Sequence, residues 1–420
     1  MALSTTSASE SMQQEQSAQQ SNKPKQPQHK RDRLITRDMA LVMLATFCFM
    51  SSNMLANPIV AGYAESLGAS GMLMGVVAGS MSFISLFCRP IAGNLSDRTS
   101  KRTLVAAGTV LYFAAGLLYY FADSPIMLIM ARVINGVGFA CCSVCLATWM
   151  SLLLPIRHMG AGMGLYGTMN ALAMAVGPAF GIRAQKYIGY RLTFLSSLVL
   201  AAIMLIATLM VKNGGQPVRK KQTSISATKK HRFSIRSILE PRVVPLSLTF
   251  MMFAIAYFAN QSFIVNYVQS RHLPVSSDLF FMFYAVALLV LRLGLRDLFD
   301  SKGFRFWLTV CSLGMLAMLA CMTFLFNDWM LLLAAIFTAV GYGLMSSVTQ
   351  AQAVVIAGRE RSGIANSTYY AGIDLGMSVG PFVGGLVYGH LPAVWFYPVF
   401  MLAMPVAWLI YLLCVKRVSR

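Results

Sequence analysis

Two charged side chains lie well inside long apolar stretches of this 420-residue chain, and they are the residues best placed to do chemistry. Asp374 stands about eleven residues into one stretch, roughly 16 Å deep in a helix that rises 1.5 Å per residue. Arg132 lies some way into another. A charge at the bilayer centre costs about 2.5–3.5 kcal/mol on insertion scales, so such a residue is a candidate for function. A buried carboxyl group can exchange a proton or bind a cationic group.

Both residues also have a structural interpretation. Asp374 would then be an acid whose hydrogen bonds a Tyr or Asn satisfies, and Arg132 would anchor its helix or pair two helices. Our functional hypothesis is that Asp374 and Arg132 take part in proton coupling or bind a charged group of a ligand.

The stretches around these charges predict membrane-spanning helices. The chain is 57% hydrophobic and only 11% charged, with a mean hydropathy of +0.64, and this argues against a soluble enzyme. Ten windows of at least 20 residues hold no Asp, Glu, Lys or Arg, and two further crossings, near 277–295 and 363–388, are interrupted only by Arg292 and Asp374. The last window divides at Gly389–Pro392. The runs lack the alternation of barrel strands, so we predict an all-α membrane protein with twelve transmembrane helices.

The distribution of basic residues predicts the orientation. Lys and Arg number 34 against 14 Asp and Glu, a net charge of +20. Assigned to loops, 29 of them fall on the side of the termini and four on the other side, Arg183, Lys186, Arg191 and Arg271. The positive-inside rule then places both termini in the cytoplasm of a multi-pass cell-membrane protein, in a bacterium the inner membrane. A nucleic-acid-binding face is the weaker interpretation, because the charges are scattered over many short loops.

Composition divides the chain into four segments. Residues 1–37, rich in Ser and Gln, predict a disordered cytoplasmic tail. Residues 38–212 and 243–416 predict two six-helix halves, and 213–242 a basic cytoplasmic linker between them. Attraction of that linker to lipid headgroups is a second interpretation.

An internal repeat relates the two halves. A shift of 203 residues superimposes a series of special positions without a gap. The pairs include Asn57 and Asn260, Arg89 and Arg292, Asp97 and Asp300, Arg102 and Arg305, Gly177–Pro178 and Gly380–Pro381, and Gly181 and Gly384. Because the repeat spans six helices, both copies cross the membrane in the same direction. This parallel arrangement predicts a substrate site between the halves, near mid-membrane.

Three motifs resemble those of the major facilitator superfamily. Gly93–Arg102 resembles the loop between its second and third helices, Gly-x-x-x-Asp-Arg-x-Gly-Arg/Lys-Arg/Lys, with Ser100 for the second Gly. Arg132–Gly138 resembles Arg-x-x-Gln-Gly-x-Gly, with Asn for Gln. Gly177–Gly181, and more fully Gly376–Gly385, resemble the Gly-Pro element associated with proton-coupled drug exporters. The resemblance covers residues 38–416 and implies the major facilitator fold, with two pseudo-symmetric six-helix halves.

The resemblance implies a role for each motif. The loop motif would latch a cytoplasmic gate, with Gly93, Asp97, Arg98, Lys101, Arg102, Asp300 and Arg305 as its candidate residues. An ordinary tight turn with positive charges is the alternative. Proline disrupts helical hydrogen bonding and glycine permits close packing, so the kink elements would let a helix rock as a unit. These candidates are Gly177, Pro178, Gly181, Gly380, Pro381 and Gly384. Simple helix packing would explain them equally.

The resemblance also implies a central cavity, and neutral polar residues of the expected helices would line it. The candidates are Asn53, Asn57, Tyr166, Asn170, Tyr257, Asn260, Tyr342, Tyr369 and Tyr370. An aromatic and amide lining suits amphiphilic organic molecules. Individually, such residues also hold helices together.

No cofactor or metal is expected. The eight cysteines lie almost entirely in apolar spans and indicate no disulfide framework. Cys141 and Cys145 are one turn apart and could hold a soft metal, but a role as small apolar filler is favoured. The chain has no phosphate-cradling Gly-Lys loop, so we expect an ion gradient, that of protons, to drive transport.

The leading prediction is a secondary active transporter, working by alternating access, that exports small organic compounds or drugs in exchange for protons. The alternative is a proton-coupled uptake symporter for a sugar, amino acid or organic anion. A membrane-embedded enzyme would need clustered His, Asp or Glu and is not predicted, and a non-transporting sensor is more remote. The expected partners are a small molecule, protons and lipids, without nucleic acid, and the chain is expected to function as a monomer.

Overall fold

The computed structural model describes the chain from residue 36 to residue 418 with short gaps, and residues 37–420 form one compact unit. The described ranges are 36–154, 159–216, 239–295, 298, 302–358 and 362–418. Within these ranges the chain is helical, without a β-strand. Nearly all of the predicted tail and most of the predicted linker lie outside the described residues.

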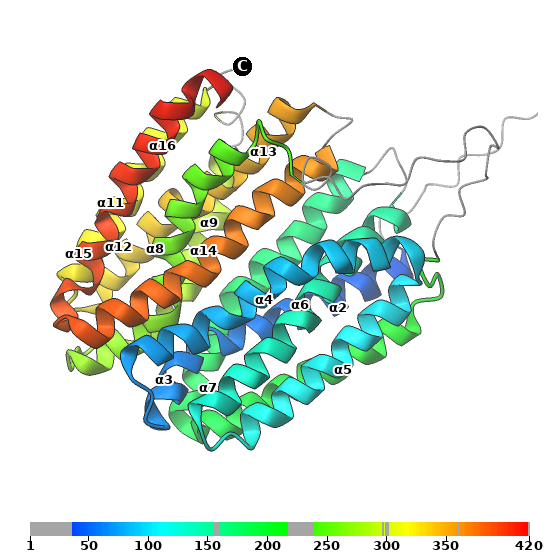
Figure 1. Ribbon diagram of the computed structural model, residues 1–420, viewed down its shortest axis with the longest axis horizontal. Coiled ribbons are helices and arrows are strands. Elements are labelled where there is room, and N and C mark those ends of the chain that lie inside the picture. Colours follow the sequence, from blue (N-terminus) through cyan, green and yellow to red (C-terminus); the bar gives the residue numbers. More distant parts are fainter. Residues whose placement is uncertain are drawn as a thin grey trace, which may run out of the picture. The chain divides into compact units, whose positions relative to one another are not determined.

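The N-terminal half, residues 37–210, contains six helical crossings, the last two of them within one long helix. Its helices are α2 (Arg37–Ala56), α3 (Val60–Ser66), α4 (Gly71–Arg98), α5 (Lys101–Tyr120), α6 (Pro125–Leu153) and α7 (Met159–Met210). Pro58 lies in the turn between α2 and α3, which together make the first crossing. The long α7 is interrupted at Gly189, where φ is 78° and ψ is 173°, a conformation that glycine tolerates best. The chain reverses there and returns beside α5 (Figure 1).

The C-terminal half, residues 244–418, repeats this pattern. Its helices are α8 (Val244–Ser270), α9 (Ser277–Gly294), α11 (Phe304–Thr323), α12 (Asp328–Thr338), η3 (Ala339–Leu344), α13 (Met345–Ala357), α14 (Ser362–His390), η5 (Ala393–Trp395), α15 (Phe396–Met401) and α16 (Ala403–Val418). The segments α12, η3 and α13 follow one another without a break and form one crossing. We call the end of the helices that holds Arg37 and Arg98 the terminal face, and the end that holds Ser66 and His390 the opposite face.

Ten helices among the described residues are long and apolar enough to cross a membrane. One of them, Leu165–Met210, has 46 residues and contains the reversal at Gly189, so it supplies two crossings. The 18-residue α9 is a further candidate. With these two adjustments the arrangement accommodates the predicted twelve helices, and the fold is that of an all-α membrane protein.

Glycines place the paired helices of each half in direct backbone contact. A Cβ on Gly177 of α7 would lie 2.8 Å from the Cβ of Met54 and 3.0 Å from the carbonyl oxygen of Ser51, both in α2. In the C-terminal half, a Cβ on Gly380 of α14 would lie 2.5 Å from the carbonyl oxygen of Ile255 in α8. The repeat seen in the sequence is therefore also a repeat of helix packing.

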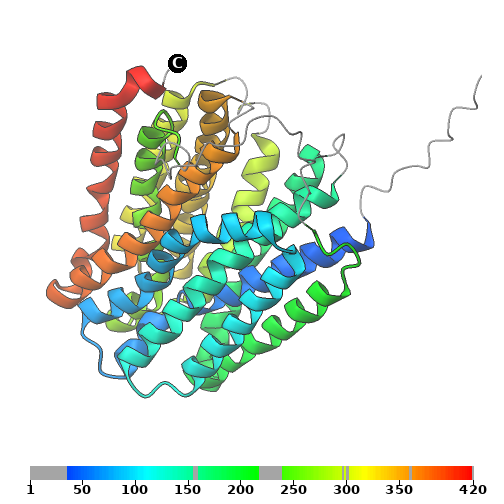
Figure 2. The ribbon, with the colours of Figure 1, turned by 45° about the vertical axis from the view of Figure 1, so that its right-hand side comes forward.

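The two halves meet closely at the opposite face, where α4 packs against α14 (Figure 1 and Figure 2). A Cβ on Gly75 would lie 2.6 Å from the carbonyl oxygen of Pro381 and 3.0 Å from the Cα of Gly385. Nearby, Glu65 of α3 accepts hydrogen bonds from Asn266 of α8 and from Tyr388 of α14. Packing and polar contacts together hold the halves against each other at this face.

Candidate functional site

Asp374 forms an ion pair that bridges the two halves. It lies in α14 with a side-chain exposure of 1%, and its partner is Arg89 of α4. The Nη2 atom of Arg89 donates to Oδ1 of Asp374 at 3.0 Å, and Nε faces Oδ2. Since Arg89 belongs to the N-terminal half and Asp374 to the C-terminal half, any separation of α4 from α14 must break this pair.

Aromatic rings flank the Arg89 guanidinium. Its central carbon lies 5.4 Å from the ring centroid of Phe139 in α6 and 5.8 Å from that of Tyr370 in α14. The Arg89 side chain is 21% exposed, and Tyr370 is 41% exposed. Beside Tyr370, Gln350 donates hydrogen bonds to the Tyr370 hydroxyl at 3.5 Å and to Asn366 at 3.4 Å. The pair is therefore buried on the Asp374 side and accessible on the Arg89 side.

Arg89 is not among the site residues predicted from the sequence, because the charge-free window 66–88 ends just before it. The structure corrects that boundary, since α4 continues to Arg98 and Arg89 lies well inside it. Arg132 and Asp374 are therefore not the only embedded charges. The repeat could have found Arg89, because a shift of 203 residues pairs it with Arg292.

Arg132 is fixed within the N-terminal half. It lies in α6 with 2% exposure, and both Nη atoms donate to Oδ1 of Asn57 at 3.2 Å. Its Nε donates to the carbonyl oxygen of Val77 at 3.2 Å, and Nη2 also donates to that of Ala78 at 2.5 Å. Two predicted site residues, Arg132 and Asn57, thus contact each other and connect α6, α4 and the turn after α2. A role of Arg132 in coupling stays a prediction.

Four aromatic rings stack in the C-terminal half. The rings of Tyr257 and Tyr342 are parallel, with centroids 4.0 Å apart, and Phe250 lies 5.5 Å from both Tyr342 and Tyr369. The Tyr369 hydroxyl donates to the carbonyl oxygen of Ser346 at 3.0 Å. Tyr342 lies in η3, a π-helical turn of the kind often found at functional sites. Three predicted lining residues therefore meet in one buried cluster.

The remaining lining candidates lie apart. Asn260 is fully buried, and its Oδ1 accepts a hydrogen bond from Tyr397 at 2.9 Å. Asn53 is fully buried as well, and its side-chain amide has no hydrogen-bond partner within the described residues. Asn170 donates to the carbonyl oxygen of Tyr166 at 3.2 Å. Of the nine candidates only Asn170 and Tyr370 are not buried, so they are the ones directly accessible in this conformation.

Arg292 is a second embedded cation, which the sequence places within the crossing near 277–295 and pairs with Arg89 through the repeat. It lies in the last turn of α9, and its Nε is buried without a hydrogen-bond partner in the described part of the chain. Its guanidinium is near enough to Tyr284 and Tyr342 for electrostatic interaction. The 203-residue shift places Ala171 where Asp374 stands in the second copy, so the position equivalent to Asp374 holds no acid for Arg292.

The loop motif binds the end of α7 within its own half. Arg102 donates to the carbonyl oxygens of Val211 and Lys212, and the Ser100 hydroxyl donates to that of Gly214 at 2.7 Å. The ammonium group of Lys101 binds a carbonyl one turn earlier, at Ser96. The other described motif positions, Gly93, Arg98 and Arg305, are at least partly exposed. The Asp97 side chain and Asp300 lie outside the described residues, so the gate function stays a prediction.

No cluster of three or more His, Cys, Asp or Glu side chains occurs among the residues that the structure describes. Cys141 and Cys145 lie one turn apart in α6, where Cys145 is buried and Cys141 is partly exposed.

Known proteins similar to this chain are transporters or membrane proteins. An uncharacterised MFS-type transporter of Methanocaldococcus jannaschii is 23% identical over 371 residues, which cover 85% of this chain and 92% of that protein. The synaptic vesicular amine transporter of Homo sapiens is 26% identical over 172 residues, 41% of this chain and 33% of that one.

Solved structures share the fold at low identity. A POT family transporter in complex with a thioalcohol-conjugated peptide superimposes with a TM-score of 0.72 at 12% identity, covering 91% of this chain and 97% of that one. A nucleoside transporter superimposes with a TM-score of 0.68 at 13% identity, covering 92% and 100%.

The sequence profile described as Major Facilitator Superfamily matches residues 42–327 and 303–420, nearly the whole helical part of the chain. The resemblance inferred from the motifs is confirmed. The chain therefore belongs to the Major Facilitator Superfamily and is a multi-pass membrane transporter of that type.

Proposed function

We propose that the protein is a proton-coupled secondary transporter that exports small organic compounds by alternating access. The observation that carries this proposal is the Arg89–Asp374 ion pair. The Asp374 carboxyl group is the most deeply buried one among the described residues, and this pair lies at the junction of the two halves. A proton on Asp374 can therefore alter the α4–α14 contact that must break during transport.

The coupling step follows from the cost of separating the charges. Removing one partner from a buried pair costs about 3–5 kcal/mol, because the other charge stays uncompensated. A proton on Asp374 removes that charge and frees Arg89, so α4 can leave α14 at lower cost. Loss of the proton restores the pair and favours the conformation described here. No cofactor takes part in this cycle.

The chemistry around Arg89 supports an amphiphilic organic substrate. Tyr370 provides an exposed ring, and Gln350 and Asn366 provide amide groups next to it. The relative named as a vesicular amine transporter supports an amine as the substrate, and an amine could replace Arg89 as the partner of Asp374. The substrate would thus compete with Arg89 or with the proton for the same carboxylate.

The experiment uses purified protein in proteoliposomes. A thermal-shift screen of organic amines and dyes first finds a compound that stabilises the protein, and accumulation of that compound is then measured with imposed pH gradients of both signs. We expect accumulation when the lumen is acidic, because protons leave as the compound enters. Equal movement with and without a gradient, in the wild-type protein, would overturn the proposal.

Two variants distinguish coupling from simple loss of the ion pair. The double variant Arg89→Gln with Asp374→Asn removes both charges, so no unpaired charge is buried. We expect it to catalyse exchange of labelled for unlabelled compound but not accumulation driven by protons. Asp38→Asn is the matched control, because Asp38 lies at the terminal face and accepts hydrogen bonds from the backbone of Lys212 and Asn213. Proton-driven accumulation by the double variant would refute the role of Asp374.

A second candidate is uptake of an organic anion together with protons. Arg292 favours it, because its partly buried guanidinium has no ion pair among the described residues and could be neutralised by a carboxylate of the substrate. The sign of the effective gradient distinguishes the two, since a symporter accumulates its substrate when the lumen is alkaline.

We infer that the protein acts as a monomer in the cell membrane with the terminal face in the cytoplasm, which the surplus of basic residues supports. Protease accessibility of a C-terminal tag in right-side-out vesicles tests the orientation, and protection of the tag is the expected result.

A further inference from the structure

A recess of about 540 Å³ opens at the opposite face, on the seam between the two halves. The N-terminal half contributes residues 182–187 of α7 to its walls. The C-terminal half contributes the end of α8, near Gln269, and the start of α9 with the preceding loop, residues 275–279. Its position is separate from the Arg89–Asp374 pair, which lies farther along α4 and α14.

The recess carries a cationic surplus. Arg183 and Lys186 line it, and Asp278 is the acid in its walls. The Nε of Arg183 is 4.0 Å from Asp278, and its side chain is 66% exposed. Lys186 makes no hydrogen bond or ion pair with other described residues. The two positive charges of Arg183 and Lys186 therefore face the single negative charge of Asp278, whose contact with Arg183 is long.

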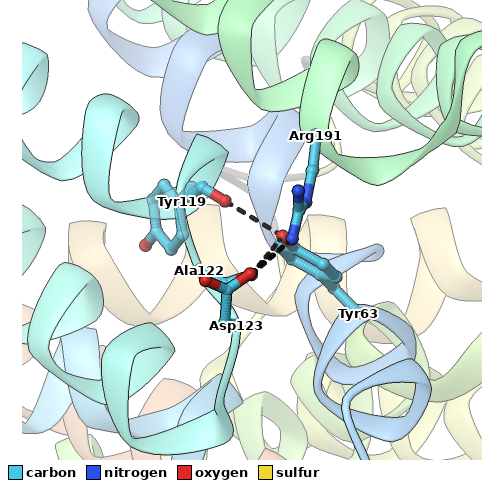
Figure 3. Close-up of polar contacts among 5 residues, drawn as sticks. All are labelled: Tyr63, Tyr119, Ala122, Asp123 and Arg191. Atoms are coloured by element: carbon cyan, nitrogen blue, oxygen red, sulfur yellow. Dashed lines mark hydrogen bonds and ion pairs between the residues drawn. The ribbon is translucent and has the colours of Figure 1, made fainter.

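The other two basic residues of this face are bound within their own halves. Arg191 donates to Asp123 at 2.6 Å and to the carbonyl oxygen of Ala122, next to the hydroxyl of Tyr63 (Figure 3). Arg271 donates to the Tyr267 hydroxyl at 2.6 Å and to the carbonyl oxygen of Thr323. Arg183, with its 4.0 Å contact to Asp278, and Lys186 are thus the two basic side chains of this face that lie at the recess.

We propose that the recess binds the phosphate group of an anionic phospholipid. A phosphodiester carries one negative charge, which matches the surplus of Arg183 and Lys186 over Asp278, and both cations can donate to its oxygens. The recess lies at the ends of membrane-spanning helices, where headgroups are found. Its wall also includes Val265 and Leu279, which suit the first carbons of acyl chains, and Tyr187 at the rim is 75% exposed.

A lipid in this position would touch both halves at once. Its phosphate would bind α7 through Arg183 and Lys186, and its glycerol region would contact α8 and α9. Because the recess changes when the halves separate at this face, the lipid would stabilise the closed arrangement. Anionic lipid would thereby regulate the equilibrium between the two conformations, whatever the coupling ion.

The test uses the full-length protein in nanodiscs of phosphatidylcholine with increasing phosphatidylglycerol. Bound phosphatidylglycerol is counted by native mass spectrometry after release, and the thermal unfolding midpoint is recorded in parallel. The test variant is Arg183→Gln with Lys186→Gln, and the matched control is Arg191→Gln, on the same helix and face. We expect roughly 30-fold weaker phosphatidylglycerol binding in the double variant, since each cation near a membrane surface contributes about fivefold, and no comparable loss in the control.

Three results would overturn the proposal. One is equal phosphatidylglycerol binding in the wild-type protein and the double variant. Another is an equal loss in Arg191→Gln, which would indicate a general surface-charge effect. The third is a rise of the thermal unfolding midpoint with soluble glycerol phosphate in pure phosphatidylcholine discs that equals the rise with phosphatidylglycerol. That result would assign the site to a soluble anion. The charge-retaining variant Arg183→Lys with Lys186→Arg should keep the lipid, and this separates loss of binding from misfolding.

Discussion

Replacing Gly75 with alanine should shift the protein toward the conformation that is open at the opposite face. Gly75 lies in α4 against α14, and an added Cβ would lie 2.6 Å from the carbonyl oxygen of Pro381 and 3.0 Å from the Cα of Gly385. Both are backbone atoms, so no side-chain rotation can relieve the contact. The helices themselves must move apart.

The size of the shift follows from the cost of overpacking. Added carbon in a tight contact costs about 1–3 kcal/mol. When the halves separate at this face the contact is absent, so the cost falls on only one of the two conformations. A change of 1.4 kcal/mol is tenfold in an equilibrium constant, so the ratio of open to closed protein should rise roughly 5- to 140-fold.

Labelling of a cysteine at the seam measures this population. Asn266 in α8 is 1% exposed and bonds to Glu65 of the other half, so its site becomes accessible only when the halves part. In an Asn266→Cys protein whose eight native cysteines are replaced by alanine, the labelling rate with a membrane-impermeant maleimide should rise roughly 5- to 140-fold upon Gly75→Ala.

Gly177→Ala provides the control, because its Cβ would meet Met54 and Ser51 at 2.8 and 3.0 Å, within one half. This contact persists in both conformations, so the variant should lose stability without faster labelling. If Gly177→Ala accelerated labelling as much as Gly75→Ala, or if folded Gly75→Ala labelled at the wild-type rate, the α4–α14 contact would not control the opposite face.

Three further substitutions test buried polar contacts through the free energy of unfolding in detergent. Arg132→Met should cost about 1.5–3 kcal/mol because it removes the charged donor of Asn57; an unchanged midpoint would mean that these contacts do not stabilise the N-terminal half. Tyr63→Phe removes two hydrogen bonds to α5 and its following loop, and should cost about 0.5–2 kcal/mol. Tyr397→Phe leaves Oδ1 of Asn260 without its donor and should cost a similar amount, and the exposed Tyr187→Phe should leave the unfolding curve unchanged.

Much of the fold could be predicted because it depends on local properties of the chain. Transfer of apolar side chains to lipid is nearly additive along a helix, so the lengths of the uncharged runs indicate the spans. The boundary at Arg89 was wrong for the same reason, since a single charge closed the window although α4 continues to Arg98. A count of neighbouring residues contains no information about the distant acid, Asp374, that compensates the charge of Arg89.

The sequence alone determined the all-helical membrane class, the repeat, the family and the embedded position of Asp374. Only the tertiary structure decided the partners. Arg89 and Asp374 are 285 residues apart, and Arg183 and Lys186 share a recess with a loop of the other half. Whether a residue is embedded in the membrane follows from the composition of its own segment. Its contact partner depends on which helices pack together and on how far they are shifted along their axes. Backbone contacts at glycines set that shift, and they exist only once the twelve predicted helices have assembled.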